Sequence, residues 1–169
     1  MKALLLGRFQ PLHLGHLKVI TDIVKEAEYI VIAVGSAQYS HAPDNPFTAG
    51  ERHTMIAQTL KARGIENYHL VGIEDIHRYA VWVSHVVSQT PTFDKVYAHN
   101  PLSIRLFSEA GYDVVELALH EPDRYSGAEV RRRMIHGEDW RSLVPEEVAK
   151  YIEEVNGIER LRTLAGGEG

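Results

Sequence analysis

One short stretch of the chain brings together five residues that could hold a phosphate group. GRFQPLHLGH follows an apolar run and contains Gly7, Arg8, His13, Gly15 and His16. The guanidinium of Arg8 is an always-charged fork that suits phosphate oxygens. His13 and His16, three residues apart at a helix start, can both donate from ring nitrogens to one anion. Gly15 allows a phosphate or a flat base to approach the first turn closely. We therefore expect an anion site here, and a triphosphate would suit it.

Other interpretations of the same residues stay open. His16 is in line with Val19, Ile20 and Ile23, so by itself it would be a histidine of the core. The two histidines could also bind a metal ion, although no carboxylate or third histidine is near them in the sequence. Arg8 by itself would be a surface charge. The occurrence of all these residue types at one strand-to-helix junction favours the anion site.

Apolar runs and helical patterns alternate along the chain. The predicted strands are Ala3–Leu6, Tyr29–Val34, Tyr68–Ile73, Lys95–His99 and Val114–Leu119. The predicted helices are Leu14–Ala27, Thr48 to about Ala62, Tyr79–Gln89, Pro101–Ala110, Ser126–His136 and Pro145–Val155. This alternation predicts an α/β fold with a Rossmann-like, doubly wound parallel sheet of about five strands, helices on both faces and a helical C-terminal part. Ligands of such sheets bind beyond the carboxyl ends of the strands, which is where GRFQPLHLGH begins.

Two helix starts carry a capping-box pattern, and the end of the chain carries none. TAGE (Thr48–Glu51) and SGAE (Ser126–Glu129) have the Ser/Thr-x-x-Glu spacing. The closing LAGGEG predicts a loose tail over about residues 165–169. Since no repeat or linker divides the chain, we expect one domain over residues 1–169.

Composition excludes several classes of protein and site. The net charge of −5 gives no overall basic field, so we expect neither nucleic acid nor membrane as a partner. The chain has no cysteine, which excludes disulfides and thiolate metal sites. We expect a cytoplasmic protein, because the sequence shows neither a signal peptide nor a membrane-spanning run. No G-x-G-x-x-G motif follows the first strand and no Gly-Lys pair exists for a P-loop.

Two signatures and several intervening blocks resemble a known family. GRFQPLHLGH resembles the signature of the HxGH nucleotidyltransferase superfamily. RYSGAEVRRRM, residues 124–134, resembles its second signature, in which a helix start and an arginine hold ATP phosphates. GSAQYSH, NPFTAGER, AVWVSH, NPLSIRLFSEAGY and GEDWRSLVPEEV resemble the archaeal type of nicotinamide-nucleotide adenylyltransferase. The resemblance extends from Ala3 to about Leu164.

The resemblance implies transfer of AMP from ATP to nicotinamide mononucleotide, which yields NAD and pyrophosphate. It implies catalysis by Arg8, His13, His16 and Arg131. The ATP-binding residues that it implies are Gly7, Arg8, Phe9, His13, Gly15, His16, Ser126, Gly127 and Arg131. Because the attacking phosphate is already an anion, the reaction needs positioning and charge stabilisation rather than a general base.

The acceptor side of the site is less sharply defined. The resemblance implies that Trp82 stacks on the nicotinamide ring, whereas the helix around Trp82 by itself also fits a buried core tryptophan. Asp75 is either a turn carboxylate or a substrate contact. Ser36 and Gln38 would contact the nicotinamide nucleotide, and ordinary loop chemistry explains them as well.

The resemblance also bears on cofactors and assembly. No acidic cluster forms a metal cage in the sequence, so Mg²⁺ is expected to arrive bound to ATP. The relatives are commonly hexamers or tetramers, which implies a homo-oligomer. Two positions depart from the family pattern: Ala128 stands where relatives often have threonine, and Asp44 stands in the loop where some relatives place an arginine for the acceptor phosphate.

Two other functions remain as alternatives. A sister transferase would use FMN, phosphopantetheine or a sugar phosphate as acceptor, and a nucleotide-binding domain would bind without turnover. The intervening blocks, and Trp82 above all, favour an acceptor with a flat ring, and the full set of Arg8, His13, His16 and Arg131 argues against a domain that only binds.

Overall fold

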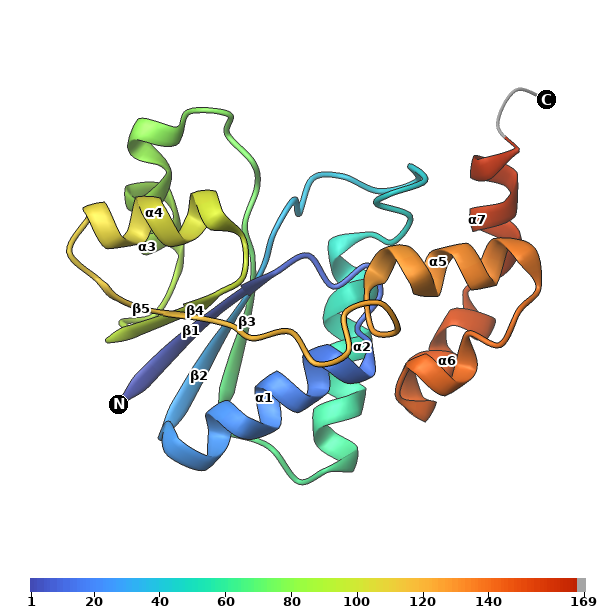
Figure 1. The fold of residues 1–169 in the computed structure, drawn as a ribbon, viewed down its shortest axis with the longest axis horizontal. Helices are drawn as coiled ribbons and strands as arrows, with labels where there is room; N and C mark the ends of the chain where they lie inside the picture. The colour runs from blue at the N-terminus through green and yellow to red at the C-terminus, as the bar shows by residue number, and fades with distance from the viewer. Residues whose placement is uncertain (167–169) are drawn as a thin grey trace. The chain divides into compact units, whose positions relative to one another are not determined.

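The structure of this protein is a computed structural model that describes residues 1–166. The chain, drawn from blue at residue 1 to red near its end in Figure 1, divides into two compact units. Unit 1 comprises Met1–Arg8, Val19–Ala37 and Asn67–Leu119, and unit 2 comprises Phe9–Lys18, Gln38–Glu66 and the residues from His120 onward. The prediction of one domain over residues 1–169 stays a prediction.

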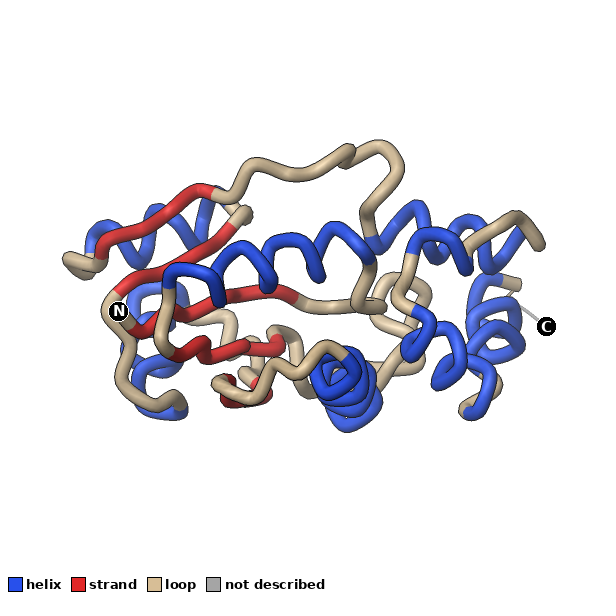
Figure 2. Tube along the Cα trace, turned by 90° about the horizontal axis from the view of Figure 1, so that it is seen from below, coloured by secondary structure: helices blue, strands red, loops and turns tan. Residues whose placement is uncertain are grey.

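Unit 1 contains a five-stranded parallel sheet, the red segments of Figure 2. The strands are β1 (Lys2–Gly7), β2 (Tyr29–Val34), β3 (Tyr68–Gly72), β4 (Lys95–Ala98) and β5 (Asp113–Glu116). Their order is β3-β2-β1-β4-β5, so the direction of the connections reverses next to β1. This order confirms the predicted doubly wound sheet.

The central strand explains why the apolar runs are continuous rather than alternating. Ala3, Leu4 and Leu5 of β1 are all buried, as expected for a parallel strand covered on both faces. Leu4 belongs to a core that also includes Phe107 of α4 (Pro101–Glu109) and Val86 of α3 (Trp82–Gln89). Figure 1 shows α3 and α4 next to each other beside β4 and β5.

Two predicted elements of unit 1 differ from the structure by more than one residue at an end. The strand predicted over Val114–Leu119 ends at Glu116, because its partner β4 ends at Ala98 and offers no further backbone to pair. The helix predicted from Tyr79 begins with a 3₁₀ turn over Tyr79–Val81 and becomes α-helical at Trp82.

Unit 2 is built mainly from helices. They are α2 (Ala49–Ala62), α5 (Gly127–His136), α6 (Glu146–Glu154) and α7 (Gly157–Ala165), with a 3₁₀ turn at Arg141–Leu143. The first residues of α1 (Leu14–Glu26) belong to unit 2 and the rest to unit 1. None of the helices in residues 1–166 combines the length and the apolar character that crossing a bilayer would require.

The two predicted capping patterns behave differently. At α2 the Thr48 hydroxyl accepts the Glu51 N–H and the Glu51 carboxylate accepts the Thr48 N–H, which completes the box. At α5 the Ser126 hydroxyl accepts the Glu129 N–H at 3.1 Å, but the Glu129 carboxylate pairs with arginines. Both helix starts are thus confirmed.

Helix α7 was not predicted, and the prediction of a loose tail from residue 165 is wrong at Ala165. Ala165 is the last residue of α7, and residues 167–169 lie outside the described part of the chain. The helix is attached to the rest of unit 2 by tertiary contacts: Leu161 is fully buried, and Arg160 makes a bidentate ion pair with Glu51 at 2.6 and 2.8 Å.

Candidate active site

His13 and His16 cap the start of α1 reciprocally. Nδ1 of His13 accepts the backbone N–H groups of Gly15 and His16 at 3.1 and 3.3 Å. Nδ1 of His16 accepts the backbone N–H of His13 at 3.1 Å. Since His13 precedes the first helical residue, these bonds have the pattern of a capping box, with imidazoles in place of the usual hydroxyl and carboxylate. The spacing H-x-x-H is the spacing that this geometry needs.

The caps also fix where the ring protons are. A nitrogen that accepts a hydrogen bond carries no proton, so each neutral ring holds its proton on Nε2. Burial lowers the pKa of His13 to about 4. Burial, and then the neighbouring His13, hold the pKa of His16 well below its usual value. At neutral pH the pair therefore consists of two uncharged rings, each with one Nε2–H donor, stacked at 3.6 Å between centroids.

Gly15 and Phe9 pack around these two rings. A Cβ on Gly15 would lie 2.9 Å from Cε1 of His13 and 3.1 Å from Cβ of Tyr125, so a side chain there would displace the His13 ring. This packing explains Gly15 without a ligand, and its contact with ATP stays a prediction. The buried ring of Phe9, at φ 55°, lies 4.7 Å from the His16 ring between centroids.

Arg131 folds back over the first turn of α5. Its Nη1 donates to the backbone carbonyl of Gln10 at 2.8 Å. A Cβ on Gly127 would lie 2.7 Å from the same Nη1, so the guanidinium occupies the space that a larger residue would fill. The charge of Arg131 thus lies beside the positive end of the α5 dipole, an arrangement suited to an anion.

The next two arginines are used differently. Arg132 binds the carboxylates of Glu129 and Glu138 at 2.7–3.0 Å. Arg133 binds Glu129 and the backbone carbonyl of Asp139. Hydrogen bonds from these two arginines lower the pKa of Glu129 to about 2. Both guanidinium groups are therefore already paired with the carboxylate of Glu129.

Gln10 contacts Arg131, one of the predicted site residues, and was not itself predicted from the sequence. Its side chain is buried, at 2 % exposure, and its amide makes two hydrogen bonds of 3.0 Å with the backbone N–H and carbonyl of Phe47. A signal for it was present in the sequence, since Gln10 is a long polar side chain between the apolar residues Phe9 and Pro11. A polar side chain in a buried apolar segment is expected to have specific hydrogen-bond partners.

Two further predicted residues, Gly7 and Arg8, lie in unit 1 at the end of β1. Gly7 is the last residue of β1, and its carbonyl accepts the N–H of Gly35 at 2.8 Å. Arg8 follows Gly7 directly. A Cβ on Gly35 would lie 3.9 Å from Cγ of Arg8, so the turn after β2 runs beside the stem of that side chain. The roles of Gly7 and Arg8 toward ATP stay predictions.

The predicted acceptor residues of unit 1 have structural partners of their own. The Ser36 hydroxyl donates to the Asp75 carboxylate at 2.6 Å, which places the two residues together after β2 and β3. This bond supports the turn-carboxylate interpretation of Asp75. Trp82 is half-buried and its ring meets that of Phe107 edge-on at 5.7 Å, so the core interpretation of Trp82 has support as well. Their contacts with a substrate stay predictions.

Gln38 and Asp44 lie in the loop before α2, in unit 2. Both are exposed, and Asp44 is at the tip of a tight turn closed between Ala42 and Asn45. The fully buried Arg52 holds this loop by donating to the carbonyl of Tyr39. The exposed side chain at the tip of this turn is thus acidic rather than basic.

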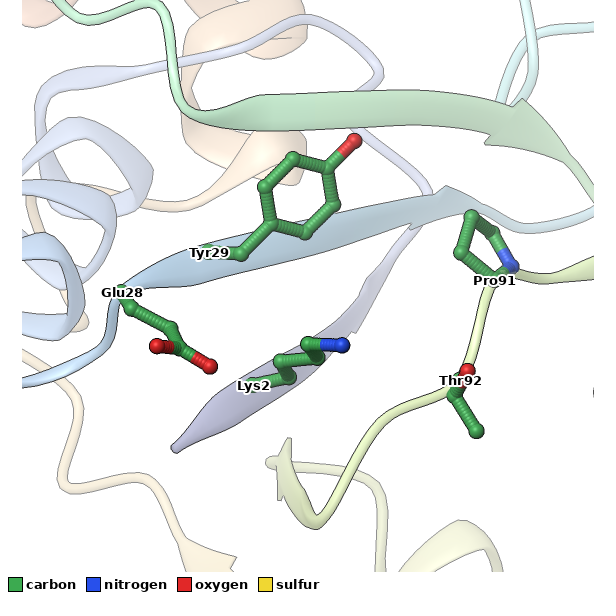
Figure 3. A pocket seen from close by; sticks show the side chains of 5 residues that line it. All are labelled: Lys2, Glu28, Tyr29, Pro91 and Thr92. Carbon is green, nitrogen blue, oxygen red and sulfur yellow. The ribbon is translucent and has the colours of Figure 1, made fainter.

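A hollow in unit 1 is lined by none of the residues predicted for the site. This shallow hollow, at the amino ends of β1 and β2, is lined by Lys2, Glu28, Tyr29, Pro91 and Thr92 (Figure 3). Within residues 1–166, no group of three or more acidic or histidine side chains is arranged to hold a metal ion.

Comparison with known proteins gives consistent matches along the chain. A family model described as cytidylyltransferase-like matches residues 4–133. A nicotinamide-nucleotide adenylyltransferase from Methanolobus tindarius is 51% identical over 164 residues, which are 97% of this chain and 94% of the relative. Proteins of the same name from Thermoplasma volcanium and Archaeoglobus fulgidus are 49% and 46% identical and cover 97% and 98% of this chain, and 92% and 98% of their own lengths.

A solved structure supports the fold. The crystal structure of a bifunctional NMN adenylyltransferase/ADP ribose pyrophosphatase from Francisella tularensis, complexed with AMP and a manganese ion, matches with a TM-score of 0.76. The identity is 18%, and the match covers 98% of this chain. This chain spans about half, 52%, of that bifunctional protein, so the likeness concerns the fold alone.

Proposed function

We infer the reaction of this chain from its family, because the chain belongs to the nicotinamide-nucleotide adenylyltransferases within the cytidylyltransferase-like family. It transfers AMP from ATP to nicotinamide mononucleotide, which yields NAD and pyrophosphate. The observation that carries this conclusion is the 46–51% identity to three proteins of that name, over nearly the full length of this chain and of each relative.

The reaction is an in-line displacement at phosphorus. A phosphate oxygen of nicotinamide mononucleotide attacks the α-phosphorus of ATP, and a new P–O bond forms. The bond from the α-phosphorus to the oxygen that bridges to the β-phosphate breaks, and pyrophosphate leaves with that electron pair. The attacking oxygen is already anionic, so no proton has to be removed. Catalysis then depends on positioning the two nucleotides and on stabilising the charge of the transition state.

The geometry of unit 2 supports a role for His13 and His16 as uncharged donors. Their Nδ1 atoms are occupied by backbone N–H groups, so each ring offers its single remaining N–H, at Nε2. Donors that are fixed in place before the reaction lose no free energy in reorganising as charge develops. The two histidines would donate to phosphate oxygens of ATP, with Phe9 and Gly15 holding the rings.

The start of α5 supports a second group of phosphate contacts. Arg131 would add its charge to the N–H groups and dipole of the helix that begins at Gly127 after the Ser126 cap. Arg8, with Gly7 before it, would supply a further guanidinium to the phosphates.

The acceptor would be bound by Trp82, which stacks on the nicotinamide ring, and by Ser36, Gln38 and Asp75. The Trp82 side chain is half-buried and makes an edge-type ring contact with Phe107. The exposed part of its ring would remain available for stacking. Asp44 supplies no positive charge in its loop, so the acceptor phosphate must be neutralised by another group.

Mg²⁺ belongs to the substrate in this proposal. It would enter bound to the phosphates of ATP and neutralise part of their charge, because phosphate oxygens are the hard ligands that Mg²⁺ prefers. We further propose a homo-oligomer, a hexamer or a tetramer, that works in the cytoplasm.

The direct test is incubation of the purified chain with ATP, Mg²⁺ and one acceptor at a time. Release of pyrophosphate together with NAD is expected for nicotinamide mononucleotide. Turnover with FMN or phosphopantetheine instead would identify a sister transferase. Tight ATP binding without turnover of any acceptor would identify a binding domain.

A further inference from the structure

We propose that Gln10 is a positioning residue that places the Arg131 guanidinium for phosphate binding. The proposal rests on the proposed function, because it assigns to Gln10 a role in the same site. Gln10 does not touch the phosphates in this account. It acts through its own backbone carbonyl, which accepts from Nη1 of Arg131 at 2.8 Å.

The side chain of Gln10 fixes the backbone of its own loop. Nε2 donates to the Phe47 carbonyl and Oε1 accepts the Phe47 N–H, both at 3.0 Å and both buried. Two hydrogen bonds from one planar amide to one residue hold the position and the orientation of the side chain together. Because Gln10 is only 2 % exposed, water cannot replace these bonds without opening the loop.

Phe47 is itself held on its other side. Its ring is fully buried, and the Arg160 guanidinium lies 5.9 Å from its centroid. A Cβ on Gly157 would lie 2.9 Å from Cε1 of the ring, so α7 packs directly against it. Arg160 also donates to the carbonyl of Pro46, the residue before Phe47. The amide of Gln10 is thus attached to a segment that α7 immobilises.

A continuous set of contacts therefore runs from α7 through Phe47 and Gln10 to Arg131. Arg131 has a long side chain with many rotamers, and a fixed carbonyl acceptor selects one in which the guanidinium lies over Gly127. Loss of the Gln10 amide would leave the buried N–H and carbonyl of Phe47 without partners and would release the carbonyl that Arg131 binds. A misplacement of about 1 Å costs on the order of 10²-fold in rate for a positioned group.

The test is a double-mutant cycle of Gln10→Ala and Arg131→Ala, read as the ATP dissociation constant and as kcat/KM for ATP. We expect Gln10→Ala to raise the ATP dissociation constant and to lower kcat/KM, each by up to about 10²-fold. When Arg131 is already alanine, the same substitution should change both values little further. The KM for nicotinamide mononucleotide should change less than that for ATP. Additive losses in the two backgrounds, or an unchanged ATP affinity in Gln10→Ala, would overturn the proposal.

Controls separate positioning from general loss of stability. Thr59→Val removes another buried hydrogen bond of unit 2, from the Thr59 hydroxyl to the Met55 carbonyl, and should lower the Tm while ATP affinity stays unchanged. If Gln10→Ala does not fold, the same cycle is run with Gln10→Met, which keeps the length of the side chain. If the wild type binds ATP but makes no NAD, the proposed function fails, and the cycle in ATP affinity still decides the role of Gln10.

Discussion

Nδ1 of His13 accepts the backbone N–H of His16, and Nδ1 of His16 accepts the backbone N–H of His13, so each of the two rings that cap α1 keeps a single N–H donor, at Nε2. One pair of side chains thereby does two things. It replaces the hydroxyl and carboxylate of an ordinary capping box, and it presents two uncharged donors whose tautomer the backbone fixes. A serine and a glutamate at these positions would cap the helix but would offer no ring N–H to an anion.

The first prediction separates the donor role of His16 from its cap. His16→Ala should lower turnover by about 10²–10³-fold, the typical cost of one preorganised donor. It should also lower the stability by about 1 kcal/mol, because the N–H of His13 loses its cap. Steady-state kinetics and thermal melting of the same preparation measure the two effects.

His16→Gln is the matched control, because glutamine at this position of a capping box can accept the same N–H. It should restore most of the Tm and little of the turnover. If His16→Gln instead restored turnover together with the Tm, His16 would be a structural residue of the core rather than a donor to substrate.

The second prediction concerns pH and stability. In the unfolded chain the pKa of His13 has its ordinary value of 6.5, whereas in the folded state burial lowers this pKa to about 4. Between these values the unfolded state holds more protons, so the free energy of unfolding falls as the pH falls, by about 3 kcal/mol for His13 alone. Urea unfolding at a series of pH values measures this slope. His13→Ser keeps a capping acceptor and removes one titrating ring, so it should make the curve less steep between pH 6.5 and 4, where His16 still contributes; an equally steep curve would contradict the assignment.

The sheet was predictable because its strands are apolar runs that need no tertiary information to recognise. Tyr29–Val34 has the predicted bounds, and the capping pattern at Thr48 begins a helix as expected. The helix α7 was not predicted: its first residue is a glycine, and the pair of Arg160 with Glu51, more than a hundred residues away, cannot be seen in the local pattern. Gln10 was missed for a similar reason: its partner Phe47 is 37 residues distant.

The third prediction compares three consecutive arginines. Arg131→Ala should lower turnover and ATP affinity by roughly 10²-fold, because it removes a charged donor at the start of α5. Arg132→Ala and Arg133→Ala should have milder effects, since both side chains already bind Glu129. ATP titration of the three variants decides the order. A larger loss in Arg132→Ala or Arg133→Ala would transfer the phosphate role to that residue.

The fourth prediction concerns the acceptor. Trp82→Ala should weaken nicotinamide mononucleotide more than ATP, by the roughly 1–3 kcal/mol that stacking on an aromatic ring contributes in nucleic-acid complexes. It should also lower the Tm, because the ring packs on Phe107. Phe107→Leu disturbs the same packing without removing the indole, so it should lower the Tm and leave the acceptor KM nearly unchanged. Equal acceptor affinity in wild type and folded Trp82→Ala would remove Trp82 from the site.

The fifth prediction uses the space that Arg131 occupies over α5. In Gly127→Ala the new Cβ would be 2.7 Å from Nη1 of Arg131, so the flexible guanidinium must move while the helix backbone stays. Alanine is at least as good as glycine in a helix, so the Tm should not fall. ATP affinity should fall toward that of Arg131→Ala. Gly50→Ala is the matched control in the first turn of α2, where the nearest atom to a new Cβ is Oγ1 of Thr48 at 3.9 Å, and it should leave ATP affinity unchanged.

The same substitution also distinguishes two ways in which Gly127 could serve ATP. If its Cβ acts only by displacing the guanidinium, Gly127→Ala should cost nothing further once Arg131 is alanine. If the Cβ instead blocks a phosphate that approaches the first turn of α5, ATP affinity should fall again in the double variant, because that clash does not depend on Arg131. Isothermal titration of the wild type, the two single variants and the double variant with ATP measures the difference. The close contact with Nη1 in the folded chain leads us to expect the first result.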